Sequence, residues 1–309
     1  RLPNSNGPMR MFPNALMGWG RGRLLILRVG SELFAITPFD ERGEPVARIL
    51  WMTDTLVGPM VLAEQGRLDP VPMVPGVREE DVRAVDGFGR VLGQVGPVCA
   101  GYLCYQESGK LVSVDTLTGR KRWERFHLPF DARCFGDEER VLVWSPKNQR
   151  VDVLRAMDGQ PLERREWNAH PDRTVLLHGR WAYRIVPKAD GSQLVCEDVA
   201  NGREIWTHNT PPGSSPVVLD RDTMGLVDPA GKLHLLNLQN GTAKAAPVNF
   251  PPMPQFERAI VTRDADSWFV VLSNRVSRQA ALQSPNQRNS HRTPPVDGPL
   301  IAIDRRTGQ

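Results

Sequence analysis

Long apolar runs are missing from this 309-residue sequence. No stretch approaches the roughly 20 consecutive apolar residues that a membrane-spanning helix needs, so we expect no transmembrane segment. Long stretches with a 3.6-residue hydrophobic period are missing too, which argues against a parallel α/β fold, because that fold needs helices between its strands. With 40% hydrophobic residues, the chain can nevertheless bury a sizeable core.

Cysteine is scarce, and its spacing fits no metal site. The chain has no CxxC pair and no metal-ligand spacing between cysteine and histidine; its four cysteines are Cys99, Cys104, Cys134 and Cys196. Cys196 takes a repeat position that other units fill with Ser113, Val153 or Leu235, so we expect a small buried thiol. Free thiols favour a reducing compartment such as the cytoplasm.

A large charge surplus and the usual catalytic motifs are also missing. The 39 basic and 35 acidic residues are interspersed and sum to only +4, so no nucleic-acid partner is expected. The six histidines are scattered without an HExxH motif, and no Gly-x-Ser-x-Gly elbow occurs. The run Gly18 to Gly22 lacks the lysine of a phosphate-binding loop and is interpreted as a glycine-rich surface turn. We therefore assign no catalytic, cofactor-binding or metal-binding residue.

One repeated unit dominates what is present. It is a short alternating strand, a polar turn closed by glycine and a strand ending in tryptophan, as in LVSVDTLTGRKRW. One such unit cannot bury its own faces, so its recurrence predicts an array. The copies are Leu111–Trp123, Val151–Trp167, Leu194–Trp206, Leu233–Ala246 and Leu300–Gln309.

The turn glycines set the period of this array. The steps from Gly119 to Gly159, Gly202 and Gly241 are 40, 43 and 39 residues, which match propeller repeats of about 40 to 45 residues. Four short strands per repeat is the number that a propeller blade requires. We therefore predict an all-β fold, a single β-propeller domain over residues 1–309 with four-stranded antiparallel blades. Six blades are expected, within a range of five to seven.

Individual strands are predicted from apolar alternation bounded by turn signals. The first is expected near Phe12 to Met17, one strand is expected over Val98 to Tyr105, and an outer strand over Thr242 to Ala245. The other predicted strands are Leu24–Val29, Glu32–Ile36, Val46–Trp51, Leu111–Asp115, Lys121–Trp123, Arg133–Phe135, Val141–Ser145, Arg150–Leu154, Leu162–Trp167, Thr174–His178, Trp181–Val186, Gln193–Asp198, Arg203–Trp206, Val217–Leu219, Thr223–Val227, Lys232–Leu236, Ala259–Thr262, Trp268–Leu272 and Leu300–Ile303.

Recurring polar, glycine and tryptophan residues receive structural roles. An Asp or Asn four positions before the glycine can bond the backbone two residues on and start the turn. The glycine is expected to take a positive φ, and the tryptophan is expected to lie against the adjacent blade. These positions are Asp115, Asp198, Asn237 and Asp304; Gly119, Gly159, Gly202, Gly241 and Gly308; and Trp123, Trp167 and Trp206, with Trp51 in a similar place.

Two segments interrupt the array. Residues 53–97 contain several prolines and are expected to form an irregular excursion with an extra hairpin from Val82–Val85 and Arg90–Val95. Residues 273–299 have few large apolar side chains, which predicts a mobile basic loop. This loop is either a solvated insertion or a docking loop for an acidic partner, and its basic residues include Arg275, Arg278, Arg288 and Arg292.

At these repeats the sequence resembles the pyrroloquinoline-quinone-like (PQQ-like) β-propeller family, whose pattern is roughly an apolar strand, Ala-x-Asp, a Thr-Gly turn and Trp. The closest copies are Leu111–Trp123 and Leu300–Gln309. The likeness covers most of residues 98–309 and, more loosely, 12–51. The family contains quinoprotein dehydrogenases, the propeller lipoprotein of the outer-membrane barrel-assembly machinery, and repeat modules of large bacterial proteins.

The resemblance implies a non-enzymatic bacterial branch of that family. Its dehydrogenases share an adjacent cysteine pair beneath the quinone, whereas Cys99 and Cys104 here are five residues apart. Our first hypothesis is therefore a non-catalytic scaffold or protein-interaction module of a larger bacterial protein, with a protein partner and no cofactor. The alternative is a quinoprotein-like oxidoreductase, or a degenerate descendant that binds a small ligand in the central channel.

Compartment and extent are less well specified. The resemblance suggests the cell envelope or periplasm, while the free cysteines favour the cytoplasm. The chain starts at Arg1 without methionine, and Leu300–Gln309 is a repeat unit without its outer strand, so we interpret the sequence as a fragment with a truncated last blade. Either a segment near Phe12 completes that blade or the native chain continues through it.

Overall fold

The structure is a computed structural model in which strands are the regular secondary structure of the described chain. It describes residues 16–21, 23–40, 42–58, 91–129, 132–146, 148–167, 175–252, 256–274 and 299–308. The chain divides into two compact units, with the boundary between Asp172 and Arg173. In the part that the structure describes, no helix is long and apolar enough to cross a lipid bilayer.

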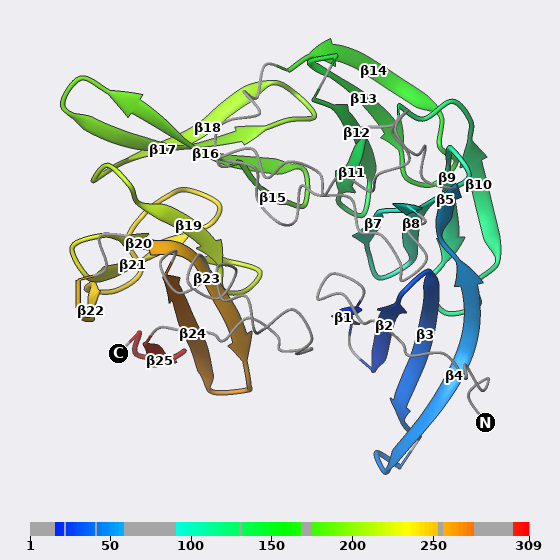
Figure 1. The fold of residues 1–309 in the computed structure, drawn as a ribbon, viewed down its shortest axis with the longest axis horizontal. Coiled ribbons are helices and arrows are strands. Elements are labelled where there is room, and N and C mark those ends of the chain that lie inside the picture. Colours follow the sequence, from blue (N-terminus) through cyan, green and yellow to red (C-terminus); the bar gives the residue numbers. More distant parts are fainter. Residues whose placement is uncertain are drawn as a thin grey trace, which may run out of the picture. The chain divides into compact units, whose positions relative to one another are not determined.

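The first unit contains three antiparallel sheets of four strands, named blades 1 to 3 here, each a meander in chain order (Figure 1). Blade 1 is β1 (Leu16–Arg21), β2 (Leu24–Val29), β3 (Glu32–Phe39) and β4 (Pro45–Asp54). Blade 2 is β7 (Val95–Val98), β8 (Tyr102–Glu107), β9 (Lys110–Asp115) and β10 (Lys121–Arg125). Blade 3 is β11 (Arg133–Gly136), β12 (Arg140–Ser145), β13 (Arg150–Arg155) and β14 (Pro161–Glu166).

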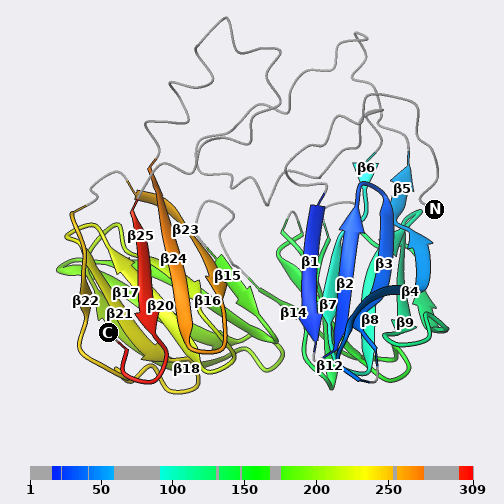
Figure 2. The same cartoon turned by 90° about the horizontal axis from the view of Figure 1, so that it is seen from below.

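The second unit contains blades 4 to 6, and Figure 2 shows the strands of its last blade side by side. Blade 4 is β15 (Val175–His178), β16 (Trp181–Lys188), β17 (Gly191–Asp198) and β18 (Arg203–Thr210). Blade 5 is β19 (Ser215–Val218), β20 (Thr223–Asp228), β21 (Lys232–Asn237) and β22 (Val248–Asn249). Blade 6 has three described strands, β23 (Phe256–Arg263), β24 (Ser267–Asn274) and β25 (Leu300–Asp304).

The predicted fold class is confirmed. The described chain is all-β, and its six large antiparallel sheets are the blades of a β-propeller, five with four strands and the last with three. That residues 1–309 form one domain stays a prediction.

The hydrophobic core lies between successive blades of each unit, because the middle strands are covered on both faces. Strand β8, with the sequence YLCYQE, is buried at five consecutive positions, whereas the outer strand β14, PLERRE, is mostly exposed. Burying one large aliphatic side chain contributes roughly 1.5–3 kcal/mol, so each interface is a strong contact. The fully buried side chains include Ile26, Leu33, Leu103, Leu111, Leu142, Leu194, Met224, Leu226, Leu233 and Leu235.

Two predictions for the N-terminal half were wrong, one of a turn and one of a strand. The glycine run is not a surface turn, because Gly18 and Gly20 lie within β1 and pair with Leu27 and Leu25 of β2. Glycine weakens a strand, but here β2 pairs with β1 along its whole length. The expected single strand Val98 to Tyr105 is two strands, because the N–H of Cys99 donates to the carbonyl of Tyr102 at 2.8 Å and the chain reverses there.

The predicted outer strand Thr242 to Ala245 was also wrong. Only Ala243 forms a bridge, with Leu236, and the ladder resumes at β22. Lys244 instead turns its ammonium to the hydroxyl of Thr223 at 2.7 Å. The Lys244 N–H still donates to the Leu235 carbonyl of β21 at 2.8 Å, but regular pairing does not continue there.

The predicted excursion lies partly outside the described residues. Residues 59–90, including the predicted strand Val82–Val85, are among those that the structure does not describe. At its ends, β5 (Leu56–Gly58) pairs with β6 (Val91–Leu92). Of the expected first strand, Phe12 to Ala15 are likewise not described.

Candidate functional site

The recurrent turn aspartates bond their own turns. Asp115 Oδ1 accepts the N–H groups of Leu117 at 3.1 Å and Thr118 at 2.9 Å, and the N–H of Gly119 donates to the Asp115 carbonyl at 2.9 Å. The Arg122 guanidinium and these turn donors lower the pKa of Asp115 to about 2. A carboxylate held in this way is a poor proton acceptor at neutral pH. The same bond to the N–H two residues on is made by the side chains of Asp198, Asn237 and Asp304.

Three of the four tryptophans at the ends of outer strands contact the turn of the next blade, whereas Trp167 packs against rings of its own blade. Trp123 Nε1 donates to the carbonyl of Ala156 at 2.8 Å, and a Cβ on Gly159 would lie 2.6 Å from the same indole. Trp206 repeats this with the Leu238 carbonyl at 3.0 Å and Gly241. Trp51 does so with Thr116 at 2.9 Å and Gly119. Trp167 is buried and packs edge-on against Trp144, with ring centroids 4.7 Å apart.

The four cysteines are free thiols with little nucleophilic character. Cys99, Cys104 and Cys196 are buried, and Cys134 is partly buried. Burial raises the pKa of both Cys134 and Cys196 to about 12, and raises that of Cys104 well above its usual value. Because the thiolate is the reactive form, these side chains act as small apolar core residues.

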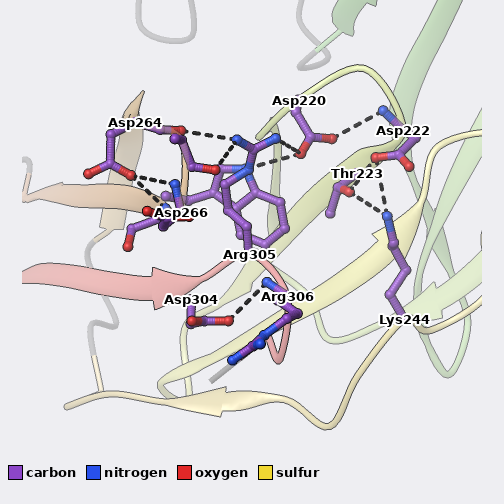
Figure 3. Close-up of polar contacts among 12 residues, drawn as sticks. Asp220, Asp222, Thr223, Lys244, Asp264, Asp266, Asp304, Arg305 and Arg306 are labelled. Carbon is purple, nitrogen blue, oxygen red and sulfur yellow. Dashed lines mark hydrogen bonds and ion pairs between the residues drawn. The ribbon is translucent and has the colours of Figure 1, made fainter.

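A charged cavity lies between blades 5 and 6 in the second unit. Its volume is about 390 Å³, and it is lined by Asp220, Arg221, Asp222, Arg263 and Arg305. Three chain segments meet there: the loop after β19, the end of β23 with its loop, and the turn after β25. Figure 3 shows how the aspartates of the two loops surround Arg305.

Arg305 is the fixed point of this cavity. Its Nη1 donates to the carbonyls of Asp264 at 3.0 Å and Ala265 at 2.9 Å. Its guanidinium carbon lies 5.8 Å from the ring centre of Trp268, and its Nη2 lies 3.6 Å from Asp220 Oδ2. Trp268 Nε1 donates to that same carboxylate oxygen at 3.2 Å. The guanidinium is therefore held by two carbonyls, a carboxylate and an aromatic face.

A second candidate surface is the outer strand β4 of blade 1. Ile49, Leu50 and Met52 are exposed there by 50%, 37% and 58%, and Val46 is exposed as well. Strand β4 pairs with β3 and is an edge of its sheet in the described chain. It therefore presents unpaired backbone groups beside apolar side chains.

The corresponding strand of blade 2 has different chemistry. Aligned on Trp51 and Trp123, the positions of Ile49, Leu50 and Met52 become Lys121, Arg122 and Glu124 in β10. Each of these charged side chains has an ion-pair partner. Lys121 lies 3.2 Å from Glu124, and Arg122 lies 2.9 Å from Asp115 on the neighbouring strand β9. Charged side chains protect a sheet edge from pairing. Strand β4 has charged residues only at Arg48 and Asp54, so charge protects its edge less than that of β10.

Sequence reasoning missed both the cavity and the strand surface. The predicted docking residues Arg275, Arg278, Arg288 and Arg292 lie outside the described residues. A usable signal for the cavity was present, because an Asp-x-Asp pair precedes both β20 (Asp220, Asp222) and β24 (Asp264, Asp266). Within the ranges that the structure describes, no three His, Cys, Asp or Glu side chains are grouped so that they could hold a metal.

The sequence matches no protein-family model and no curated protein. Solved structures are similar in fold at low identity. Hsv2 of Kluyveromyces lactis has a TM-score of 0.46 at 8% identity, covering 81% of this chain and 68% of that one. BamB of Moraxella catarrhalis has 0.37 at 14%, covering 82% and 77%. The computationally designed protein Ika8 has 0.44 at 10%, covering 97% and 87%.

Proposed function

We propose that this chain is a PQQ-like propeller module that binds a protein partner through the outer edge of β4. The observation that carries the proposal is the exposed apolar edge formed by Val46, Ile49, Leu50 and Met52. An exposed, long, apolar edge strand is a template for pairing with a strand of another chain. The PQQ-like assignment is supported by the indole of one blade lying on the turn glycine of the next.

The partner that suits this edge is an extended segment that adds a fifth strand to blade 1. Strand β4 is 10 residues long, which is enough for several main-chain hydrogen bonds. Arg48 is an exposed charge in the middle of this strand. We therefore expect alternating apolar residues in the partner, with an acidic residue opposite Arg48.

A second copy of the chain fits less well in the register that brings the apolar positions Ile49 and Leu50 together. An antiparallel pair of β4 strands centred between Ile49 and Leu50 places Arg48 opposite Trp51, whose indole is already bonded to the Thr116 carbonyl. No acid then faces Arg48. A heterologous acidic strand satisfies the charge that self-pairing leaves unmatched.

Site-specific photocrosslinking tests the surface. A photoreactive residue replaces Met52 in one protein and Glu124, the matched position of β10, in the other. We expect a discrete adduct in the lysate of the source cells from position 52 only, and the captured partner should then slow amide exchange over Pro45–Asp54 when added in purified form. Adducts of equal yield at both positions, or no protection of β4, would sink the proposal.

Paired charge substitutions measure how much the β4 edge contributes to the affinity for the partner. Ile49→Lys with Met52→Lys should weaken binding of the captured partner at least about tenfold, equivalent to about 1.4 kcal/mol. The control pair Lys121→Glu with Glu124→Lys on β10 should change binding less than about twofold, or about 0.4 kcal/mol. Unchanged binding in the β4 variant contradicts the proposal. So does dye-linked oxidation of an alcohol or sugar by the purified protein with added quinone and calcium, which would make it an oxidoreductase.

A further inference from the structure

We propose that the cavity between blades 5 and 6 is a binding site for a small oxyanion, held by Arg221 and Arg263 with Arg305 as its floor. The ligand class is a compound that presents two or more anionic oxygens, such as phosphate or a dicarboxylate. This site is separate from the β4 edge, since its residues belong to the second unit. The anion-binding proposal does not depend on the protein-binding proposal, and either one can fail without the other.

The charge of the cavity carries the inference. Each lining carboxylate already has a cation of its own: Asp220 is paired with Arg305 at 3.6 Å, and Asp222 with Lys244 at 3.2 Å. Arg221 and Arg263 are exposed and line the same cavity. Neither has an ion pair with any residue that the structure describes. Among the lining residues and Lys244, four cations therefore face two carboxylates. The carboxylates of Asp264 and Asp266 lie on the loop beside Arg305 and are not part of the cavity lining.

The lining aspartates are occupied by hydrogen bonds as well as by charge. Asp220 accepts from the indole of Trp268 at 3.2 Å and from the N–H of Asp222 at 3.1 Å. Asp222 accepts from the hydroxyl of Thr223 at 2.8 Å. These contacts hold the carboxylates against the protein and reduce their repulsion of an incoming anion. A cation would have to displace Arg305 or Lys244, so the arrangement favours an anionic ligand.

The lining cations are of a type that binds pairs of oxygens. Guanidinium groups present forked N–H donors that match carboxylate and phosphate oxygens two at a time. Arg305 is held in place by two carbonyls, the Asp220 carboxylate and the Trp268 ring. A fixed guanidinium loses little side-chain entropy when a ligand binds.

The volume of the cavity is sufficient for a small ligand. Small-molecule sites usually have volumes of roughly 300 to 1,000 Å³, and this one has about 390 Å³. A single phosphate or a short dicarboxylate with a few waters fits this space.

Titration calorimetry at low salt tests the site with inorganic phosphate and with succinate as separate probes. The test variant is Arg221→Gln with Arg263→Gln. The matched control is Arg306→Gln, which removes one positive charge from the same turn but from a side chain that does not line the cavity. We expect saturable binding of at least one probe, a Kd at least about tenfold higher in the double variant, and a change below about twofold in the control.

The preferred probe identifies the ligand chemistry, and two other results would overturn the proposal. Preference for phosphate assigns a tetrahedral oxyanion, and preference for succinate assigns a dicarboxylate. No binding of either probe at roughly 10 mM, far weaker than a typical specific ligand, overturns the proposal. Equal weakening by Arg306→Gln overturns it too, because the effect would then come from overall charge. Partner binding at β4 should be the same in all three proteins.

Discussion

At the scale of single residues, the turn glycines serve two physical needs at once. Gly241 has φ of 69°, a left-handed conformation that L side chains rarely adopt. It also lies so close to Trp206 that a Cβ would be 2.5 Å from the indole. The sequence indicated the first need through the Asn-Gly turn signal, while the second depends on a residue of another blade.

Alanine substitutions at two turn glycines separate these needs. Gly43 has φ of 84°, and nothing lies within 4 Å of its Cβ position. Gly43→Ala should therefore cost only the left-handed strain, about 1–2 kcal/mol. Gly241→Ala should cost about 1–3 kcal/mol more, because the buried indole must shift. Urea denaturation measures both losses, and equal losses would show that the Trp206 contact adds nothing.

At the scale of elements, the turns are determined by residues that are neighbours in the sequence, whereas the outer strands also depend on pairing with another strand. The turn that begins at Asp115 is a local device, because its carboxylate, its two N–H donors and Gly119 lie within five consecutive residues. Local chemistry of this kind can be inferred from the sequence. The outer strand of blade 5 was predicted wrongly, because only Ala243 of the expected residues bridges β21 and the paired strand lies at Val248–Asn249.

The Asp115 turn should make stability depend on pH. Its pKa is lowered from 3.8 to about 2 by Arg122 and the turn donors. Because the folded-state pKa lies below the unfolded value, the contribution is fully present above about pH 4 and is lost as the pH falls towards 2. Asp115→Asn keeps the side-chain carbonyl but has no charge. Its deficit in urea stability relative to the wild type should be largest near neutral pH and shrink between pH 4 and 2; a deficit that stays constant over that range contradicts this account.

At the scale of the whole molecule, the chain is a series of blades whose stability depends on contacts between neighbours. The buried side chains gather in clusters between successive blades, such as Leu111, Trp123 and Val141 in the first unit and Leu194, Trp206 and Met224 in the second. Repeat proteins of this kind behave approximately as sums of repeat and interface energies. Interfaces that share no residues should then act independently.

Two tryptophan variants test that independence. Trp123 and Trp206 lie in different units and share no partner in the described chain. Each substitution to Ala should cost roughly 3–5 kcal/mol, and the double variant should lose their sum to within about 0.5 kcal/mol. Urea denaturation of the wild type, the two single variants and the double variant measures these losses. If the double Ala variant does not fold, the corresponding Trp→Phe variants replace it. A departure from the sum beyond about 1 kcal/mol would reveal coupling between the units.

The amino-acid sequence by itself determined the blades, because their signals are local. Alternation with a period of two and turns closed by glycine act within a few residues, and they identified nearly every strand and the number of blades. The same locality explains the errors: an apolar run concealed the reversal at Cys99, and glycines concealed the pairing of β1 with β2.

Only the tertiary structure decided which residues meet. The cavity joins Asp220 to Arg305, which are far apart in the chain and come together because β19 and β23 begin adjacent blades. The exposed edge of β4 is likewise not a property of its sequence alone, since an apolar strand such as β8 is buried when other strands cover it. Burial and charge pairing depend on neighbours supplied by distant segments, and one-dimensional patterns do not specify those neighbours.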